Sequence, residues 1–223
     1  MRTDRMFMFL SALEMNNSRE WFYENQDEYK RAKGDFEELL AALTPRVRTA
    51  DPAVAALPVD KIAYRLSRDT RFSRDKSPYT PAFRAHFGPA GKLPVPCGYF
   101  LSIRPGDRSF LGGGLCRADL GDAPFRIRAA IDRQGGALSQ IEMEMGLPLL
   151  GEKLKRMPAG FPPDHPQGEY LKLKQWYVEY PLPDRIVLSP DALIRDIPRA
   201  CARLRPLNEF LNRALSGFQW PIR

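Results

Sequence analysis

The chain has 223 residues, of which 43% are hydrophobic and 27% charged, with 13 Phe, 8 Tyr and 3 Trp. This composition supports a globular core and excludes wholesale disorder. No apolar run approaches the ~20 residues of a membrane span, and Met1 to Leu13 lacks the cleavage site of a signal peptide. We therefore expect a cytoplasmic protein with one domain over residues 1–223.

Residues 1–58 are predicted to be helical. Apolar residues recur on one side of the segment 4–15, a short helix carries Trp21 and Phe22, and a long helix with a period close to 3.5 runs from Tyr29 to Val47. Pro45 lies inside the long helix and predicts a kink or an end there.

Residues 59–120 are predicted to be mainly strand, because apolar and polar residues alternate in four runs. These runs span residues 62–66, 83–87, 99–103 and 109–116. The last run contains Gly112, Gly113 and Gly114, which predict a bulge or the close approach of a neighbouring side chain. The alternative is that the exposed backbone of these glycines lies beneath a bound ligand. Successive strands without helices between them favour antiparallel pairing.

Residues 121–188 mix helix and loop, and residues 189–223 are predicted to be helical. Helices follow Asp122 and the Gly135-Gly136 pair, a loop covers 146–168, and a last strand covers 175–180. Pro198 and Pro206 are expected to divide the C-terminal helix. The predicted fold class is α+β: an antiparallel sheet of about four to six strands with the N-terminal and C-terminal helices packed on it.

Positive charge is concentrated in the middle of the chain. The net charge is +7, and residues 61–133 alone carry a net +8. A localised basic segment attracts phosphates, carboxylates or nucleic acid.

The densest basic stretch is the segment 65–79. Arginines stand at positions 65, 68, 71 and 74, followed by Lys76, with only Asp69 and Asp75 to balance them. Arginine forks bind carboxylate or phosphate at two points. We therefore predict a pocket for an anionic ligand with the candidate binding residues Arg68, Arg71, Lys76, Lys155 and Lys174, to which Lys172 could add. The alternative is that Arg–Asp pairs only hold the loop together, and at least one such pair is expected in either case.

A second hypothesis is nucleic-acid or phosphoprotein binding through residues 61–133. Basic residues interleaved with aromatic ones are typical of single-strand binding. The segment contains nine aromatic residues: Tyr64, Phe72, Tyr79, Phe83, Phe87, Tyr99, Phe100, Phe110 and Phe125. Strand periodicity, however, places Phe83, Phe87 and Tyr99 in the core. An interaction scaffold without a pocket is a third hypothesis.

The evidence for catalysis is weak. His165, beside Asp164 in a proline-rich loop, is a candidate general acid or base, although a structural histidine is the commoner case. The sequence has three widely spaced cysteines, Cys97, Cys116 and Cys201, and only two histidines. We therefore predict that no metal is bound and that the thiols are separate, with at least one of them buried. We also predict no cofactor. The sequence leaves open whether the protein is an enzyme.

Two motifs resemble an uncharacterised, largely bacterial family catalogued as a domain of unknown function. They are Asn16-Asn17-x3-Trp21-Phe22 and Arg68-Asp69-x-Arg71-Phe72-Ser73-x-Asp75-Lys76-x-Pro78-Tyr79. The resemblance continues through Gly112–Gly114 and the stretches from Arg126 to Arg128, Leu154 to Phe161 and Asp164 to Lys174, so it covers nearly the whole chain. It implies no activity, cofactor or catalytic residue. The position of Cys116 is more often aromatic in such proteins, which argues against a nucleophilic role for it.

Overall fold

A four-stranded antiparallel sheet forms the centre of the protein in the computed structural model, which describes residues 1–71, 73–117 and 121–219. The strands are adjacent in chain order: β1 (Phe83–Phe87), β2 (Tyr99–Ile103), β3 (Ser109–Leu115) and β4 (Trp176–Leu182). In the register, Gly113 lies opposite both Tyr99 on β2 and Val178 on β4. The predicted α+β class with an antiparallel sheet is confirmed.

Helices precede, interrupt and follow the strands. They are α1 (Thr3–Met15), α2 (Arg19–Glu24), α3 (Gln26–Ala50), α4 (Val59–Ile62), α5 (Ala123–Arg133), α6 (Ala137–Met145), α7 (Gly168–Leu171), α8 (Asp184–Val187) and α9 (Pro190–Ala214). None of the helices in the described parts of the chain combines the length and apolarity that a bilayer crossing demands.

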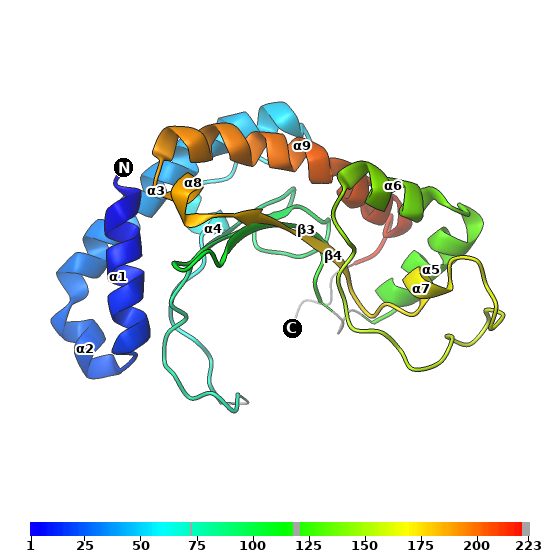
Figure 1. The fold of residues 1–223 in the computed structure, drawn as a ribbon, viewed down its shortest axis with the longest axis horizontal. Coiled ribbons are helices and arrows are strands. Elements are labelled where there is room, and N and C mark those ends of the chain that lie inside the picture. The colour runs from blue at the N-terminus through cyan, green and yellow to red at the C-terminus, as the bar shows by residue number, and fades with distance from the viewer. Residues whose placement is uncertain (72, 118–120, 220–223) are drawn as a thin grey trace.

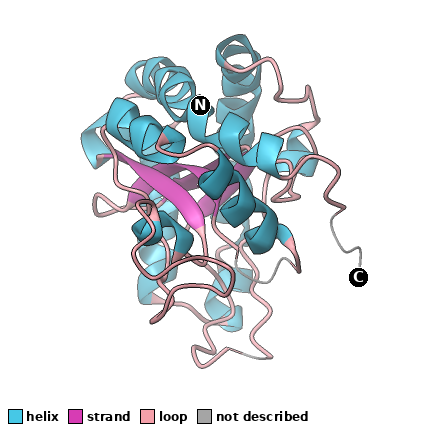
Figure 2. Cartoon of the chain, turned by 90° about the vertical axis from the view of Figure 1, so that its right-hand side faces the viewer, coloured by secondary structure: helices cyan, strands magenta, loops and turns pink. Residues whose placement is uncertain are grey.

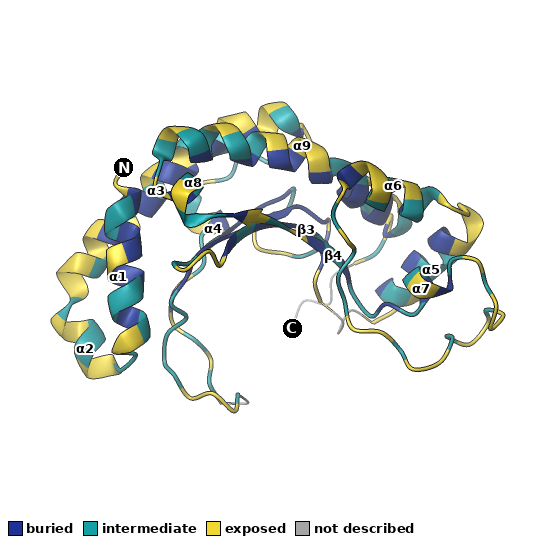
Figure 3. Ribbon diagram, viewed as in Figure 1, coloured by how far each residue is buried: buried dark blue, intermediate teal, exposed yellow. Residues whose placement is uncertain are grey.

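The long helices α3 and α9 lie side by side and cover one face of the sheet (Figure 1). Helix α1 packs on α3 at one end of the molecule, and α5 and α6 pack on α9 at the other. Figure 2 shows the strands at the centre with helices gathered around them. The sides of α3 and α9 that face the sheet are buried and their outer sides exposed (Figure 3), as amphipathic helices on a sheet require.

Both long helices continue through their prolines. Helix α3 therefore does not end at Pro45, and the predicted division of the C-terminal helix at Pro198 and Pro206 is wrong. Helix α3 runs on to Ala50, and α9 is continuous from Pro190 to Ala214. Each internal proline removes one backbone hydrogen bond. Fully buried residues on both sides of each proline, such as Leu43 and Val47, are held against the core, and this packing outweighs the local cost.

The predicted strand over 62–66 is also wrong. Its beginning forms the short helix α4, and the backbone that follows forms isolated bridges, of Ala63 with Ala85 and of Ser67 with Tyr79, in place of a strand. Ile62 and Leu66, four residues apart, are both buried, whereas Tyr64 between them is half-buried. The alternation was therefore too short to distinguish a strand from a helical turn followed by an extended segment.

Gly113 and Gly114 of β3 allow α9 to approach the sheet closely. A Cβ on Gly113 would lie 3.1 Å from the Cβ of Leu204, and Gly114 has a φ of +92° with Trp176 O only 2.3 Å from the position of a Cβ. The buried Asn208 of α9 accepts a hydrogen bond from the Gly114 N–H at 2.7 Å. These contacts confirm the close-approach interpretation of the glycine run.

Helix α1 is joined to the turn between β2 and β3 by Glu14. Its carboxylate accepts hydrogen bonds from Arg108 at 2.6 and 2.9 Å and from Arg104. The hydrogen bonds from Arg108 lower the pKa of Glu14 most strongly. Burial acts in the opposite direction and the bond from Arg104 adds to the lowering, so the pKa falls from 4.5 to about 2.

We expect Glu14→Gln to flatten the acid dependence of stability. A carboxylate with a depressed pKa stabilises the fold fully above its unfolded pKa of 4.5 and loses that contribution as the pH falls towards 2. Because Glu14 is one-third exposed, we expect a contribution of about 1 kcal/mol after solvent screening. Urea denaturation between pH 7 and 2 measures it. If the free energy of unfolding fell with pH to the same extent in the variant and the wild type, the assigned contribution of Glu14 would be contradicted.

Candidate anion-binding site

The basic segment forms a long loop with two arms, which precedes β1 in the chain and extends away from the sheet (Figure 1). The Arg68 N–H donates to Pro78 O at 2.9 Å and the Thr80 N–H to Leu66 O at 2.8 Å, so the two arms of the loop are held together by backbone hydrogen bonds. The tip of the loop carries the arginines and aspartates of the motif.

Arg–Asp pairs hold this loop, as predicted. Asp69 accepts from the Arg71 side chain at 2.6 to 3.2 Å, and Asp75 accepts from Arg68 and from the hydroxyl and N–H of Ser77. The hydrogen bonds from the Arg71 guanidinium and N–H lower the pKa of Asp69 to about 2. The two Ser77 bonds, followed by the Arg68 bond, hold the pKa of Asp75 well below its usual range. Both carboxylates are thus ionised near neutral pH.

The two sequence motifs meet in space through Asn17. Its amide donates to Tyr79 O at 2.9 Å and accepts from the Tyr79 N–H at 3.1 Å, across 62 residues of sequence. The rings of Phe22 and Tyr79 stack beside this contact, with centroids 4.1 Å apart. Ser18 caps α2 by accepting from the Trp21 N–H, so the Asn17 side chain is not the cap of that helix.

A pocket of about 390 Å³, which we call the loop pocket, lies between the start of α2 and the basic loop. It is lined by Asn17, Ser18, Arg19, Glu20, Ser67, Arg68, Thr70, Lys76, Pro78 and Tyr79. Three of these side chains are cationic and one is a carboxylate, so the pocket has a positive balance.

The cations of the loop pocket differ in how far they are already engaged. Arg68 is 25% exposed and donates to Asp75 and, at 3.2 Å, to Ser73. Lys76 Nζ donates one hydrogen bond, to Thr70 O at 3.0 Å, and keeps two protons for other acceptors. The exposed Arg19 side chain has no hydrogen-bond or ion-pair partner among the described residues.

The structure places the other predicted binding residues outside the loop pocket. Arg71 does not belong to the lining of the loop pocket, and its side chain, which is 77% exposed, pairs with Asp69. Lys155 lies between α6 and α7, and Lys174 between α7 and β4, whereas the loop pocket lies between α2 and the basic loop. Figure 1 shows α6 and α7 at the opposite end of the molecule from α2. Lys174 pairs there with Glu152 at 2.8 Å, whereas Lys155 is exposed.

His165 is held in a structural arrangement. Its Nδ1 accepts from the Gln167 N–H at 3.0 Å, so Nε2 carries the proton and donates to Asp132 at 3.0 Å. The orienting carboxylate is thus on α5 and is not the adjacent Asp164. With 11% of its side chain exposed and the ring of Phe161 against its own, His165 ties the loop to α5.

The cysteines are separate, with Cys97 and Cys201 buried and Cys116 exposed. Burial raises the pKa of the Cys97 thiol to about 12, which keeps it protonated. Within the described ranges, no group of three or more His, Cys, Asp or Glu side chains has the geometry of a metal site.

The fold and its pocket define a class: an α+β protein with helices on one face of an antiparallel sheet and a basic pocket where its N-terminal helices meet a long loop. The model of the family described as "Conserved hypothetical protein (DUF2461)" matches residues 5–210, and the chain belongs to this family. No curated protein and no solved structure matches the chain significantly.

Proposed function

We propose that this protein binds a small anionic ligand, with a phosphate or carboxylate group, in the loop pocket. The observation that carries the proposal is the gathering of Arg19, Arg68 and Lys76 from two distant segments around one pocket with a single carboxylate, Glu20, in its lining. The volume of about 390 Å³ is that of a site for a small metabolite.

The available donors support an anionic ligand. The planar fork of Arg19 can bind a carboxylate or phosphate at two points, and Lys76 adds a point charge with two remaining protons. The charge of Arg68 is balanced by Asp75, so this residue forms a wall of the pocket while Arg19 and Lys76 supply the binding charge. Hydroxyls of Ser67 and Thr70 offer further hydrogen bonds.

A second candidate function is single-stranded nucleic-acid binding on the sheet face opposite α9. Gly113 faces α9, so its neighbour Gly112 and the paired Phe100 face the other way. On that face the rings of Tyr64, Phe100 and Phe110 follow one another with centroids 5.8 and 6.1 Å apart, all half-buried. Such a row can stack bases, whereas Phe83, Phe87 and Tyr99 are buried in the core.

We expect inorganic phosphate, a sugar phosphate or a small dicarboxylate to raise the melting temperature in a concentration-dependent way. Arg19→Gln and Lys76→Gln should each weaken binding about tenfold or more, as expected for a lost charge-assisted hydrogen bond. Arg74→Gln is the matched control, because Arg74 is an exposed cation of the same loop outside the pocket lining. Thermal shift followed by calorimetric titration measures these effects.

An equal loss in Arg74→Gln would show a diffuse charge effect and overturn the pocket assignment. Stabilisation by a short oligonucleotide that is lost in Phe100→Leu, but kept in Arg19→Gln, would favour the sheet-face function instead.

A further inference from the structure

A second cavity, which we call the helix pocket, lies between α1 and the start of α3 with α2 beside it. Its volume is about 410 Å³, enough for a ligand of one or two rings. It shares no lining residue with the loop pocket, so an occupant would be recognised by a separate set of side chains.

One side of the helix pocket is apolar and aromatic. The rings of Phe9 and Trp21 line it with centroids 6.0 Å apart, and Met8 and Ala12, one helical turn apart on α1, complete it. Met8 is 70% exposed although it lies next to these rings. A flexible, polarisable methionine beside an aromatic wall can pack against a bound ring.

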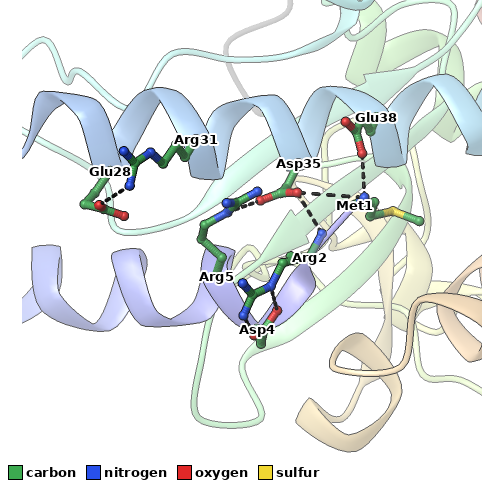
Figure 4. Close-up of polar contacts among 8 residues, drawn as sticks. All are labelled: Met1, Arg2, Asp4, Arg5, Glu28, Arg31, Asp35 and Glu38. Carbon is green, nitrogen blue, oxygen red and sulfur yellow. Dashed lines mark hydrogen bonds and ion pairs between the residues drawn. The ribbon is translucent and has the colours of Figure 1, made fainter.

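The other side has a positive balance, since Arg2, Arg5 and Arg31 line it with one carboxylate, Glu28. Figure 4 shows Arg5 extending from α1 to Asp35 on α3, with Arg31 further along α3. Arg5 donates its Nε to Asp35 at 2.5 Å, and its two terminal amino groups have no hydrogen-bond partner among the described residues. Arg31 uses Nη1 for Glu28 at 2.9 Å and is exposed.

Asp35 fixes the position of Arg5. The aspartate is 3% exposed and also accepts the backbone N–H of Arg2 at 2.7 Å, so it joins the two helices at this point (Figure 4). The guanidinium is thereby held through its Nε–H on Asp35, and its terminal nitrogens make no hydrogen bond to the described residues. Such a preorganised fork requires little further ordering to bind an anion.

We propose that the helix pocket is a binding site for an aromatic monoanion, an aryl carboxylate or its sulfonate analogue. The ring would pack against Trp21 and Phe9 beneath Met8, and the anionic group would accept hydrogen bonds from the terminal nitrogens of Arg5, with Arg31 adding charge. The combination of an aromatic wall with an arginine fork distinguishes this site from the polar loop pocket. The proposal stands independently of anion binding in the loop pocket.

The test compares 1-naphthoate with neutral 1-naphthylmethanol on the full chain by isothermal titration calorimetry. We expect naphthoate to bind about tenfold or more tightly than the alcohol, because only the anion engages the arginine fork. Ala12→Leu fills the pocket with a good helix former and should abolish binding. Met8→Glu adds a repelling carboxylate at the rim and should weaken naphthoate binding about tenfold.

Two controls locate the binding. Met143→Glu makes the same change at a methionine that is 75% exposed on α6 and should leave binding unchanged. Lys76→Gln alters only the loop pocket and should also leave naphthoate binding unchanged. Absence of naphthoate binding, equal affinity for the alcohol, or binding that survives both Ala12→Leu and Met8→Glu in folded protein would overturn the proposal. A loss in Lys76→Gln would do the same, since it would assign naphthoate to the loop pocket.

Discussion

Replacing Gly114 by alanine is expected to lower the free energy of unfolding by about 3 kcal/mol, the sum of backbone strain and overpacking. The residue has a φ of +92°, which L side chains rarely adopt, and an added Cβ would lie 2.3 Å from Trp176 O and 3.1 Å from Leu207 Cδ2. Since the first contact is with backbone, relief requires moving β3, β4 or α9. The effect is large because this is where α9, which shares the greatest helix length of 25 residues with α3, meets the centre of the sheet.

Gly34→Ala is the matched control, because it adds the same methyl group at a position in α3 where a Cβ meets nothing within 4 Å. That variant should be more stable than the wild type by up to about 1 kcal/mol, the helix propensity difference. Urea denaturation of both variants measures the contrast. A Gly114→Ala protein as stable as the wild type would show that α9 does not press on β3 as described.

Asn17→Ala is expected to lower stability by about 1–3 kcal/mol, for two lost hydrogen bonds, and also to weaken anion binding. The Asn17 amide is bonded to both the N–H and the carbonyl of Tyr79, and this contact fixes Arg19 of α2 relative to Arg68 and Lys76 of the loop. Once it is lost, the cations no longer keep a common geometry, and the preorganisation of the pocket is reduced.

Asn16→Ala is the control for this experiment. Asn16, at the end of α1, is exposed, and among the described residues its side-chain amide donates only to Ala12 O of that helix, at 2.9 Å. It should change stability by less than Asn17→Ala and leave the affinity for phosphate unchanged. Chemical denaturation and phosphate titration on both variants give the two readouts. If Asn17→Ala left the phosphate affinity unaltered, the Asn17–Tyr79 contact would make no contribution to binding in the loop pocket.

The sequence by itself determined the elements whose signal is local. Alternation predicted strands over 83–87, 99–103 and 109–116, and the structure has them over the same residues except that the third ends at 115. The pattern is local because each strand residue faces either the helices or the opposite side. Helical periodicity likewise predicted the buried sides of α3 and α9. The Arg–Asp contacts of the basic loop were predictable because the partners are two and seven residues apart.

What the tertiary structure decided depends on contacts between distant residues. Packing against the core carries α3 through Pro45, although the local chemistry of proline predicts an interruption. Arg19 has no motif of its own to mark it as a binding residue; only the Asn17–Tyr79 contact brings it to the basic loop. The same fold excludes Arg71 from that pocket and places Lys174 at the far end of the sheet. Residue spacing encodes local geometry, but which cations share a pocket is set by hydrogen bonds and packing between segments that are remote in the chain.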